Sequence, residues 1–352
     1  MKLVAWSALV LGLACGGRSP AAQPTKAVPL GPKNAWTWVD VAGASCGDGS
    51  PTGFAVNPGD APDVLTFLDG GGACWDYTTC FTLALASPGP FGEAQLDARL
   101  AAFAWTFFDR ADPSNPFRSW TYVFIPYCTG DLHAGDADAS YRPLGPDMRP
   151  SRRWQHHGRA NIRADLLLLS AAFPDPLRLV VSGASAGGYG ALLEYDTFRA
   201  AWPAARTFLV DDSGPPLEGD AIQPALHGAW RAAWRLDTLL DPICARCRDD
   251  LSSLVTAVAS RHPDDRLALL SSLQDRVIRA FVVLPPTGFE AALRMMVHDR
   301  FDPLPSARTF LVPGEAHALL AAPGSFTAGG VPLATWLAQM VDGDPAWRSV
   351  GP

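Results

Sequence analysis

The sequence predicts an α/β protein with a mostly parallel, doubly wound sheet in a single domain. From residue 63 onward, short apolar runs typical of buried strands alternate with segments of helical periodicity. At 352 residues, with 48% hydrophobic and 18% charged residues, the chain is long enough to build one large core. Glycines and polar residues follow several of the apolar runs, where open parallel sheets build their sites. We therefore expect one folded domain over residues 35–352.

The N-terminus has the pattern of a targeting segment. Lys2 precedes an apolar run over residues 3–13, and small residues follow up to Cys15, so residues 1–15 predict a signal peptide. The run is too short for a permanent membrane span. It resembles a bacterial lipoprotein processing site with Cys15 as the lipidated residue, although Gly12 stands where such sites prefer leucine. Residues 16–34, rich in Pro, Ala and Gly, predict a flexible tether.

This pattern predicts export, either as a bacterial cell-envelope lipoprotein of the periplasm or outer membrane or as a secreted protein. Any membrane attachment would then depend on a lipid on Cys15. The net charge of −7 argues against a nucleic-acid partner, which would call for a basic surface.

The strands and helices can be placed in order along the chain. Two or three short strand-like pieces occupy residues 36–55, and residues 91–110 have a helical and then a loop-like pattern. Apolar runs predict core strands over 63–69, 121–126, 177–181, 206–210, 267–272 and 309–312. Periodicity predicts helices over 158–172, directly after residue 187, and over 221–240, 249–260 and 332–341.

The chain is organised around Gly183-Ala184-Ser185-Ala186-Gly187, which lies between a predicted strand and a predicted helix. This is the strand–turn–helix context of a G-x-S-x-G nucleophile elbow. A serine on so sharp a turn needs glycine two positions before and after it, because side chains there would collide. The alternative is a glycine-rich connection in which Ser185 only caps the helix.

A serine nucleophile needs an imidazole to take its proton and a carboxylate to orient that imidazole. In this architecture the chain order is Ser, then Asp or Glu, then His. Of the four histidines after Ser185, only His317 follows the last strand in a glycine-containing loop, so we expect it to be the base. Asp275 follows the strand that usually carries the acid. Asp212, one strand earlier beside Asp211, remains the alternative.

Three glycines follow the strand over residues 63–69 and leave backbone N–H groups open to a ligand. We expect Gly71 and Gly72 to form an oxyanion hole with the N–H of Ala186. The alternative for the glycines is a plain tight turn. Together these residues predict acyl transfer, in which Ser185 attacks an ester carbonyl and no metal or organic cofactor is needed.

Polar residues also follow the strand over 121–126. Asp131, His133 and Asp136 are candidate pocket residues because they lie at a strand's carboxyl end. The alternative is that they only make hydrogen bonds within their own loop.

Apart from Cys15, the chain has six cysteines: Cys46, Cys74, Cys80, Cys128, Cys244 and Cys247. An even number in an exported chain suggests disulfides, although the sequence alone leaves all pairings open. Cys244 and Cys247 have the C-x-x-C spacing of a zinc site. A second such pair or a nearby histidine pair is missing, so we expect no metal.

Several segments resemble the pectin acetylesterase family, to which the animal carboxylesterase Notum also belongs. The segments are Phe-Leu-Asp-Gly-Gly-Gly-Ala-Cys-Trp (67–75), Asn-Pro-Phe (115–117), Phe-Ile-Pro-Tyr-Cys-Thr-Gly-Asp-Leu-His-Ala-Gly-Asp (124–136), Gly-Ala-Ser-Ala-Gly-Gly (183–188) and Asp-Ser-Gly (212–214). The match runs from about residue 36 to 317, with residues 124–128 its most specific part. It looks closest to the bacterial branch, whose members are often exported lipoproteins.

The resemblance implies an α/β-hydrolase fold and carboxylic-ester hydrolysis without a cofactor. By position it implies a triad of Ser185, Asp275 and His317, with Asp212 in a structural turn. It also implies the pairs Cys74–Cys80 and Cys46–Cys128, which leaves Cys244–Cys247 as a local pair. One departure is Ala73-Cys74-Trp75, since plant and animal members carry a bulky residue earlier in this loop. We expect that difference to alter the pocket wall.

The expected function is therefore that of an exported serine carboxylesterase for short acyl esters, chiefly acetyl, with an acylated carbohydrate or another ester as its substrate. Two alternatives remain. One is a lipid-ester deacylase of the Notum type, and the other is a non-catalytic, surface-anchored binding protein on a hydrolase scaffold.

Overall fold

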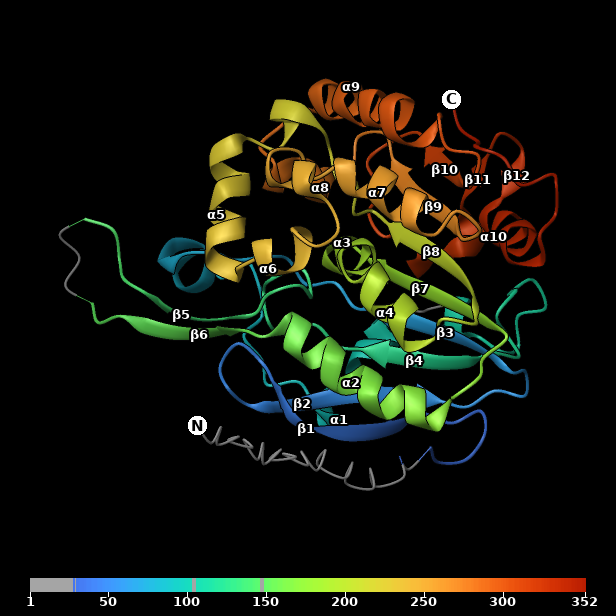
Figure 1. Cartoon of the computed structure of the whole chain (residues 1–352), viewed down its shortest axis with the longest axis horizontal. Helices are drawn as coiled ribbons and strands as arrows, with labels where there is room; N and C mark the ends of the chain where they lie inside the picture. Colours follow the sequence, from blue (N-terminus) through green and yellow to red (C-terminus); the bar gives the residue numbers. More distant parts are fainter. Residues whose placement is uncertain (1–27, 29, 103–105, 146–148) are drawn as a thin grey trace, which may run out of the picture.

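The computed structural model describes residues 28, 30–102, 106–145 and 149–352 (Figure 1). The predicted signal peptide, Cys15 and most of the predicted tether lie outside these residues. Within the described ranges, no helix combines the length and the apolar character needed to cross a membrane.

An eight-stranded sheet forms the centre of the protein, in the order β1-β2-β4-β3-β7-β8-β9-β10. Its strands are β1 (Thr37–Ser45), β2 (Pro51–Asn57), β3 (Asp63–Leu68), β4 (Thr121–Ile125), β7 (Arg178–Ala184), β8 (Arg206–Asp212), β9 (Arg266–Ser272) and β10 (Ala307–Val312). β2 runs antiparallel to both its neighbours, and the pairs from β4 to β10 are all parallel. The predicted fold class, a mostly parallel sheet in one domain, is confirmed.

Helices cover both faces of this sheet (Figure 1). They are α1 (Glu93–Ala102), α2 (Gly158–Ala172), α3 (Ala186–Leu193), α4 (Tyr195–Ala201), α5 (Pro224–Trp234), α6 (Asp237–Leu240), α7 (Ser253–Arg261), α8 (Arg276–Phe281), α9 (Pro286–Met296) and α10 (Leu333–Asp342). Alternate residues of each strand point to opposite faces. In β3, Val64 and Leu68 pack in the core under α2, α3, α5, α7 and α9, whereas Leu65 and Phe67 pack in the core with α1 and α10.

The parallel strands end together at one edge of the sheet, and this alignment positions the site. Leu68 at the end of β3 is in register with Gly183 of β7, and Ala184 is in register with Asp212 of β8. Ser272 of β9 is likewise in register with Val312 of β10. The loops after these strands therefore leave the sheet side by side. The residues of the predicted site lie in these loops, except Asp212, which is the last residue of β8.

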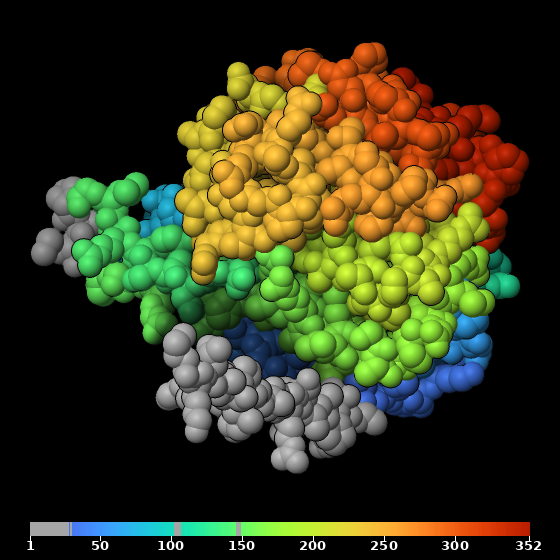
Figure 2. All heavy atoms as spheres, viewed as in Figure 1, coloured from blue at the N-terminus to red at the C-terminus, as the bar shows by residue number. Residues whose placement is uncertain are grey.

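Several parts of the chain differ from the sequence prediction. The helix expected over residues 221–240 is divided into α5 and α6, because Arg235 adopts a left-handed conformation (φ 57°) and ends α5. The short helix α8 begins directly after Asp275 and was not predicted. A hairpin, β5 (Ala137–Tyr141) paired with β6 (Arg152–His156), projects from the body (Figure 1 and Figure 2) and was not predicted either.

Candidate active site

Ser185 lies on the turn between β7 and α3, with backbone angles of φ 59° and ψ −121°. Such a conformation is strained for a residue with a side chain and persists only where its surroundings impose it. The flanking glycines allow the turn. A Cβ on Gly183 would lie 2.2 Å from the carbonyl oxygen of Gly187, and a Cβ on Gly187 would lie 1.9 Å from that of Leu68. The Ser185 N–H donates a hydrogen bond of 2.8 Å to the carbonyl oxygen of Asp212.

His317 follows β10, and its Nδ1 lies 2.7 Å from Oδ2 of Asp275. Asp275 is fully buried at the N-terminus of α8, where its Oδ1 accepts hydrogen bonds from the N–H groups of Val277 (2.9 Å) and Ile278 (3.0 Å). One carboxylate oxygen is therefore fixed by the helix, and the other receives the imidazole. This is the geometry expected of an acid that orients a histidine.

The carboxylate of Asp212, the alternative acid, has different hydrogen-bond partners. Its Oδ1 accepts from the N–H of Leu319 (3.0 Å) and its Oδ2 from that of Leu320 (2.7 Å). The hydroxyl of Ser213 donates a third hydrogen bond to Oδ1 (2.9 Å). Burial raises the pKa of Asp212 to about 6. The carboxylate thus binds the backbone just beyond His317, whereas that of Asp275 contacts the imidazole itself.

The glycine loop packs directly against the serine turn. A Cβ on Gly70 would lie 2.6 Å from the carbonyl oxygen of Ala184 and 3.0 Å from Cβ of Ser185, so only glycine fits. Asp69 directly precedes the loop and holds its start in place, because its buried carboxylate forms a bidentate ion pair with Arg99 at 2.6 and 2.7 Å.

A small pocket opens beside Ser185. It is lined by Gly72, Ala73, Leu132, Ser185, Ala186, Tyr189, Trp230, Ile278, Phe281 and Val282. Its cavity volume is about 20 Å³, enough for roughly one water-sized group. Of the three predicted oxyanion-hole residues, Gly72 and Ala186 lie in this lining. Gly71 is exposed beside Tyr127 and does not belong to the lining.

Most of the apolar lining was not identified from the sequence. Ile278, Phe281 and Val282 have the i, i+3, i+4 spacing of one helix face, so a helix starting at Asp275 could have been recognised from this pattern. Trp230 comes from α5, which lies near α3 and α8 in Figure 1. Nothing in its sequence context distinguishes it from an ordinary core residue.

Comparison with known proteins adds to this geometry. The sequence pattern of a family described as Pectinacetylesterase matches residues 33–247, more than half of the chain. The chain belongs to the pectinacetylesterase family. The matched part includes Ser185, the glycine loop and Asp212. It ends before Asp275 and His317, so the expectation that these two residues belong to the site rests on the structure and on their order in the chain.

Two plant relatives illustrate the similarity within the pectinacetylesterase family. Pectin acetylesterase 11 of Arabidopsis thaliana is 27% identical over 184 residues, which are 51% of this chain and 44% of the relative. Pectin acetylesterase 5 of the same plant is 30% identical over 185 residues, which are 49% of this chain and 39% of the relative. The chain thus matches less than half the length of either relative. Both are plant proteins, so the resemblance to a bacterial branch stays a prediction.

The fold is also similar to that of the Wnt deacylase Notum from Drosophila. One crystal form of Notum aligns with a TM-score of 0.65 and 18% identity, covering 89% of this chain and 94% of Notum. A second crystal form gives a TM-score of 0.64. At this level of identity the similarity supports the α/β-hydrolase fold expected for a pectinacetylesterase family member.

The loop after β4 is arranged differently from the predicted pocket. Asp131 is fully buried, and its oxygens accept hydrogen bonds from the Thr129 hydroxyl (2.6 Å) and the Gly158 N–H (2.8 Å). Burial raises its pKa to about 6. Nε2 of His133 lies 2.9 Å from the carbonyl oxygen of Asp69, and burial lowers the pKa of His133 to about 4. These two residues therefore hold the loop together.

The pocket prediction for this loop is revised accordingly. The residue that reaches the pocket is Leu132, which lies between Asp131 and His133. The N–H of Leu132 donates to the hydroxyl of Tyr127 (2.9 Å). Asp136, the third predicted pocket residue, is partly exposed at the start of the hairpin and does not belong to the pocket lining.

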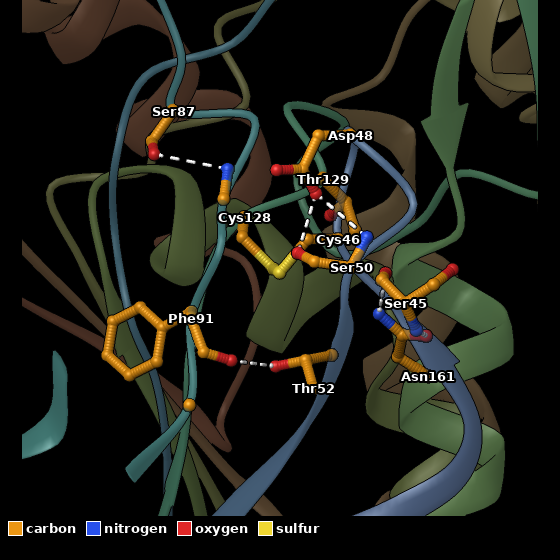
Figure 3. The surroundings of a disulfide bond; sticks show 12 residues. Ser45, Cys46, Asp48, Ser50, Thr52, Ser87, Phe91, Cys128, Thr129 and Asn161 are labelled. Carbon is orange, nitrogen blue, oxygen red and sulfur yellow. Dashed lines mark hydrogen bonds between the residues drawn. A yellow bond between two sulfur atoms is a disulfide. The ribbon is translucent and has the colours of Figure 1, made fainter. Parts of the chain in front are cut away.

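The six cysteines form the three disulfides that the family resemblance implies: Cys46–Cys128, Cys74–Cys80 and Cys244–Cys247. Cys244 and Cys247 are thus joined to each other, and no group of three or more potential metal ligands occurs in the described part of the chain. Figure 3 shows the Cys46–Cys128 disulfide beside Ser45, whose N–H donates to the side chain of Asn161 (3.0 Å). This disulfide links the end of β1 to the loop that carries Leu132.

Proposed function

We propose that this protein is a serine carboxylesterase that hydrolyses short acyl esters, chiefly acetyl esters, on polysaccharide. The observation that carries the proposal is the placement of Ser185 and the His317–Asp275 pair on loops that leave the same edge of the parallel sheet, after β7, β9 and β10. Ser185 is held in the strained turn of a nucleophile elbow and faces a small apolar pocket. His317 is oriented by a buried carboxylate at 2.7 Å.

In the proposed mechanism, Oγ of Ser185 attacks the ester carbonyl while Nε2 of His317 accepts its proton. Asp275 holds the Nδ1–H of His317, which keeps Nε2 available as the acceptor, and it stabilises the imidazolium that forms. The N–H groups of Ala186 and the glycine loop would bind the oxyanion. His317 then protonates the leaving alcohol, and water repeats the sequence to release the acid and free Ser185.

The size and character of the pocket favour a short acyl group. The space beside Ser185 that a water-sized group can occupy is about 20 Å³ and its lining is apolar, which suits a methyl group better than a long chain. Acetyl esters fit this limit, and the matching plant proteins are named pectin acetylesterases. Trp75, which is partly exposed, lies 5.9 Å from Trp230 between ring centroids and extends the apolar lining outward. The alcohol part of the substrate would lie on this outer side.

We also infer that the protein is exported. Three disulfides form and persist in oxidising compartments, and structural disulfides are rare in the cytosol. The sequence around Cys15 adds the proposal of a lipid-anchored protein of a bacterial cell envelope. If Cys15 carries the lipid, labelled palmitate should be incorporated into the wild type and not into Cys15→Ala. Equal labelling of both would exclude Cys15 as the site.

The esterase proposal is tested by turnover of p-nitrophenyl esters from acetate to palmitate. We expect the highest kcat/KM with acetate and loss of several orders of magnitude in Ser185→Ala. A maximum at long chains would favour a lipid-ester deacylase instead. An absence of turnover, together with no labelling by a fluorophosphonate probe, would indicate a binding protein. A panel of acetylated glycans would then identify the alcohol part.

A further inference from the structure

Asp212 and Ser213 lie at the end of β8, between the serine turn and the segment that follows His317. Their contacts reach both sides. On one side, the carbonyl oxygen of Asp212 accepts the N–H of Ser185 at 2.8 Å. On the other side, its carboxylate accepts the N–H groups of Leu319 and Leu320 at 3.0 and 2.7 Å. The hydroxyl of Ser213 accepts the N–H of Ala318 at 3.1 Å.

We propose that Asp212, assisted by Ser213, is a positioning residue that fixes the His317 loop to the serine turn. This inference rests on the proposed function. Asp212 acts through other residues, because its hydrogen bonds reach the backbone on either side of the reacting groups. Its carboxylate therefore sets the place of the imidazole relative to the Ser185 hydroxyl.

The backbone conformations support this role. Ser185, Ser213 and Ala318 have φ angles of 59°, 60° and 61°, in the left-handed region that residues with side chains rarely adopt. Each of these three residues takes part in one of the hydrogen bonds made by Asp212 or Ser213. Strained conformations of this kind persist where the surrounding contacts impose them. Without the carboxylate, the segment from Ala318 to Leu320 would lose the contacts that hold it in this form.

The other side of the His317 loop is held separately. The carbonyl oxygen of Gly314 accepts the N–H of Gln274 at 2.9 Å, and Glu315 forms an ion pair with Arg279 at 2.8 Å. These contacts anchor the part of the loop before His317 to the start of α8, near Asp275. Asp212 anchors the part after it. His317 is thus fixed between two anchors, of which Asp212 is the one that also contacts the serine turn.

The charge state of Asp212 matters for this anchor, since an ionised carboxylate accepts backbone hydrogen bonds more strongly than a neutral carboxyl group. Burial raises its pKa to about 6. The charged or titratable groups that face it are Asp211 on its own strand and His317 from the loop after β10. We therefore expect the contribution of this anchor to activity to be lost as the pH falls through the pKa of Asp212.

The test compares Asp212→Asn with Asp211→Asn. Asp211 is an equally buried neighbour, and its Oδ1 accepts the N–H of Gly214 (2.9 Å) within its own turn. Hydrogen–deuterium exchange should become faster over residues 318–320 in Asp212→Asn only. With p-nitrophenyl acetate, kcat should fall about 10–100-fold while KM changes less than about threefold, as expected for a small misplacement of a catalytic group. Asp211→Asn should retain wild-type kcat.

Two further measurements keep the test decisive. Ser213→Ala removes the acceptor for Ala318 and the hydroxyl that donates to Asp212, and it leaves the Asp212 carboxylate in place. It should change exchange and kcat in the same direction as Asp212→Asn, and it serves as the test if Asp212→Asn folds poorly. The acid limb of the kcat profile should include an ionisation near pH 6 in the wild type that is absent in Asp212→Asn. An inactive wild type would refute the proposed function. Normal wild-type turnover with unchanged exchange, or unchanged kcat, in Asp212→Asn would refute the positioning role alone.

Discussion

Replacing Asp275 by Asn tests the assignment of the acid. The change keeps the shape of the side chain and an oxygen that can still accept from Val277 and Ile278, at 2.9 and 3.0 Å in the wild type. The fold should therefore change little, and the loss of a negative charge at the N-terminus of α8 should cost about 1 kcal/mol or less. The amide NH₂ would then face Nδ1 of His317, where Oδ2 lies at 2.7 Å in the wild type.

The consequence for catalysis follows from the tautomer of His317. An NH₂ group opposite Nδ1 requires that nitrogen to be an acceptor, so the ring proton moves to Nε2. In that state Nε2 cannot take the proton of Ser185. We expect kcat to fall by about 10⁴-fold, the scale found for this substitution in serine proteases. That loss corresponds to about 5.4 kcal/mol of transition-state stabilisation.

The assay is p-nitrophenyl acetate turnover, with the melting temperature of each variant measured by circular dichroism. Asp212→Asn is the matched comparison, because Asp212 is equally buried and should lose far less activity. A larger loss in Asp212→Asn than in Asp275→Asn would refute the assignment of Asp275. So would an Asp275→Asn variant that melts like the wild type and retains about a tenth or more of its kcat.

Three further predictions concern stability and specificity. The Cys46–Cys128 disulfide closes a loop with a sequence separation of 82, so replacing both cysteines by Ala should lower the free energy of unfolding by about 4.5 kcal/mol in urea titrations. Replacing both Cys244 and Cys247, with a separation of 3, should lower it by only about 1.6 kcal/mol. Equal losses in the two variants would contradict this prediction. Burial raises the pKa of Glu194 from 4.5 to about 7, so its protonated form stabilises the fold at low pH and that stability is lost as pH rises through 7. Glu194→Gln should therefore raise the melting temperature at pH 8 and not at pH 4.5, with a gain of up to roughly 3 kcal/mol in the free energy of unfolding at pH 8. A variant whose stability has the wild-type pH dependence would refute this prediction. Phe281→Ala should enlarge the pocket and raise kcat/KM for butyrate relative to acetate by about tenfold, whereas an unchanged ratio would mean that Phe281 does not limit acyl length.

The sequence was most informative where a local pattern has one physical cause. The strand before Ser185 and the glycines on either side of it predict the turn, because side chains at Gly183 and Gly187 would collide with nearby carbonyl oxygens. The site of His317 follows from chain order, since parallel strands bring the loops at their carboxyl ends together. The core strands were predicted for the same kind of reason, as buried strands such as β3 read as continuous apolar runs.

The pocket could not be predicted in the same way, because it depends on where side chains point. Asp131 and His133 are polar residues in a loop at the sheet edge, and their types suit either a pocket or internal hydrogen bonds. Leu132 and His133 adopt left-handed backbone conformations, with φ of 57° and 60°. No residue pattern in this segment predicts these conformations. Leu132 is held by the hydroxyl of Tyr127 in the same loop, and His133 by the carbonyl oxygen of Asp69, which is distant in the sequence. Leu132 rather than its polar neighbours thus reaches the pocket.

The hairpin of β5 and β6 was missed for a related reason. Its strands carry polar and charged residues on exposed positions, so the apolar alternation that marks a half-buried strand is weak. Trp154 is the exception, and it is buried against Phe81 at 5.5 Å between ring centroids. Long-range packing of this kind cannot be read from the segment itself.

The central claim is that Ser185 is the nucleophile of an ester hydrolase. The most direct measurement is reaction with a fluorophosphonate probe, followed by mass spectrometry to locate the modified residue. We predict a single modification on Ser185, with label and p-nitrophenyl acetate turnover both lost in Ser185→Ala. Label on another residue, or a Ser185→Ala variant that turns over acetate at the wild-type rate, would contradict the account.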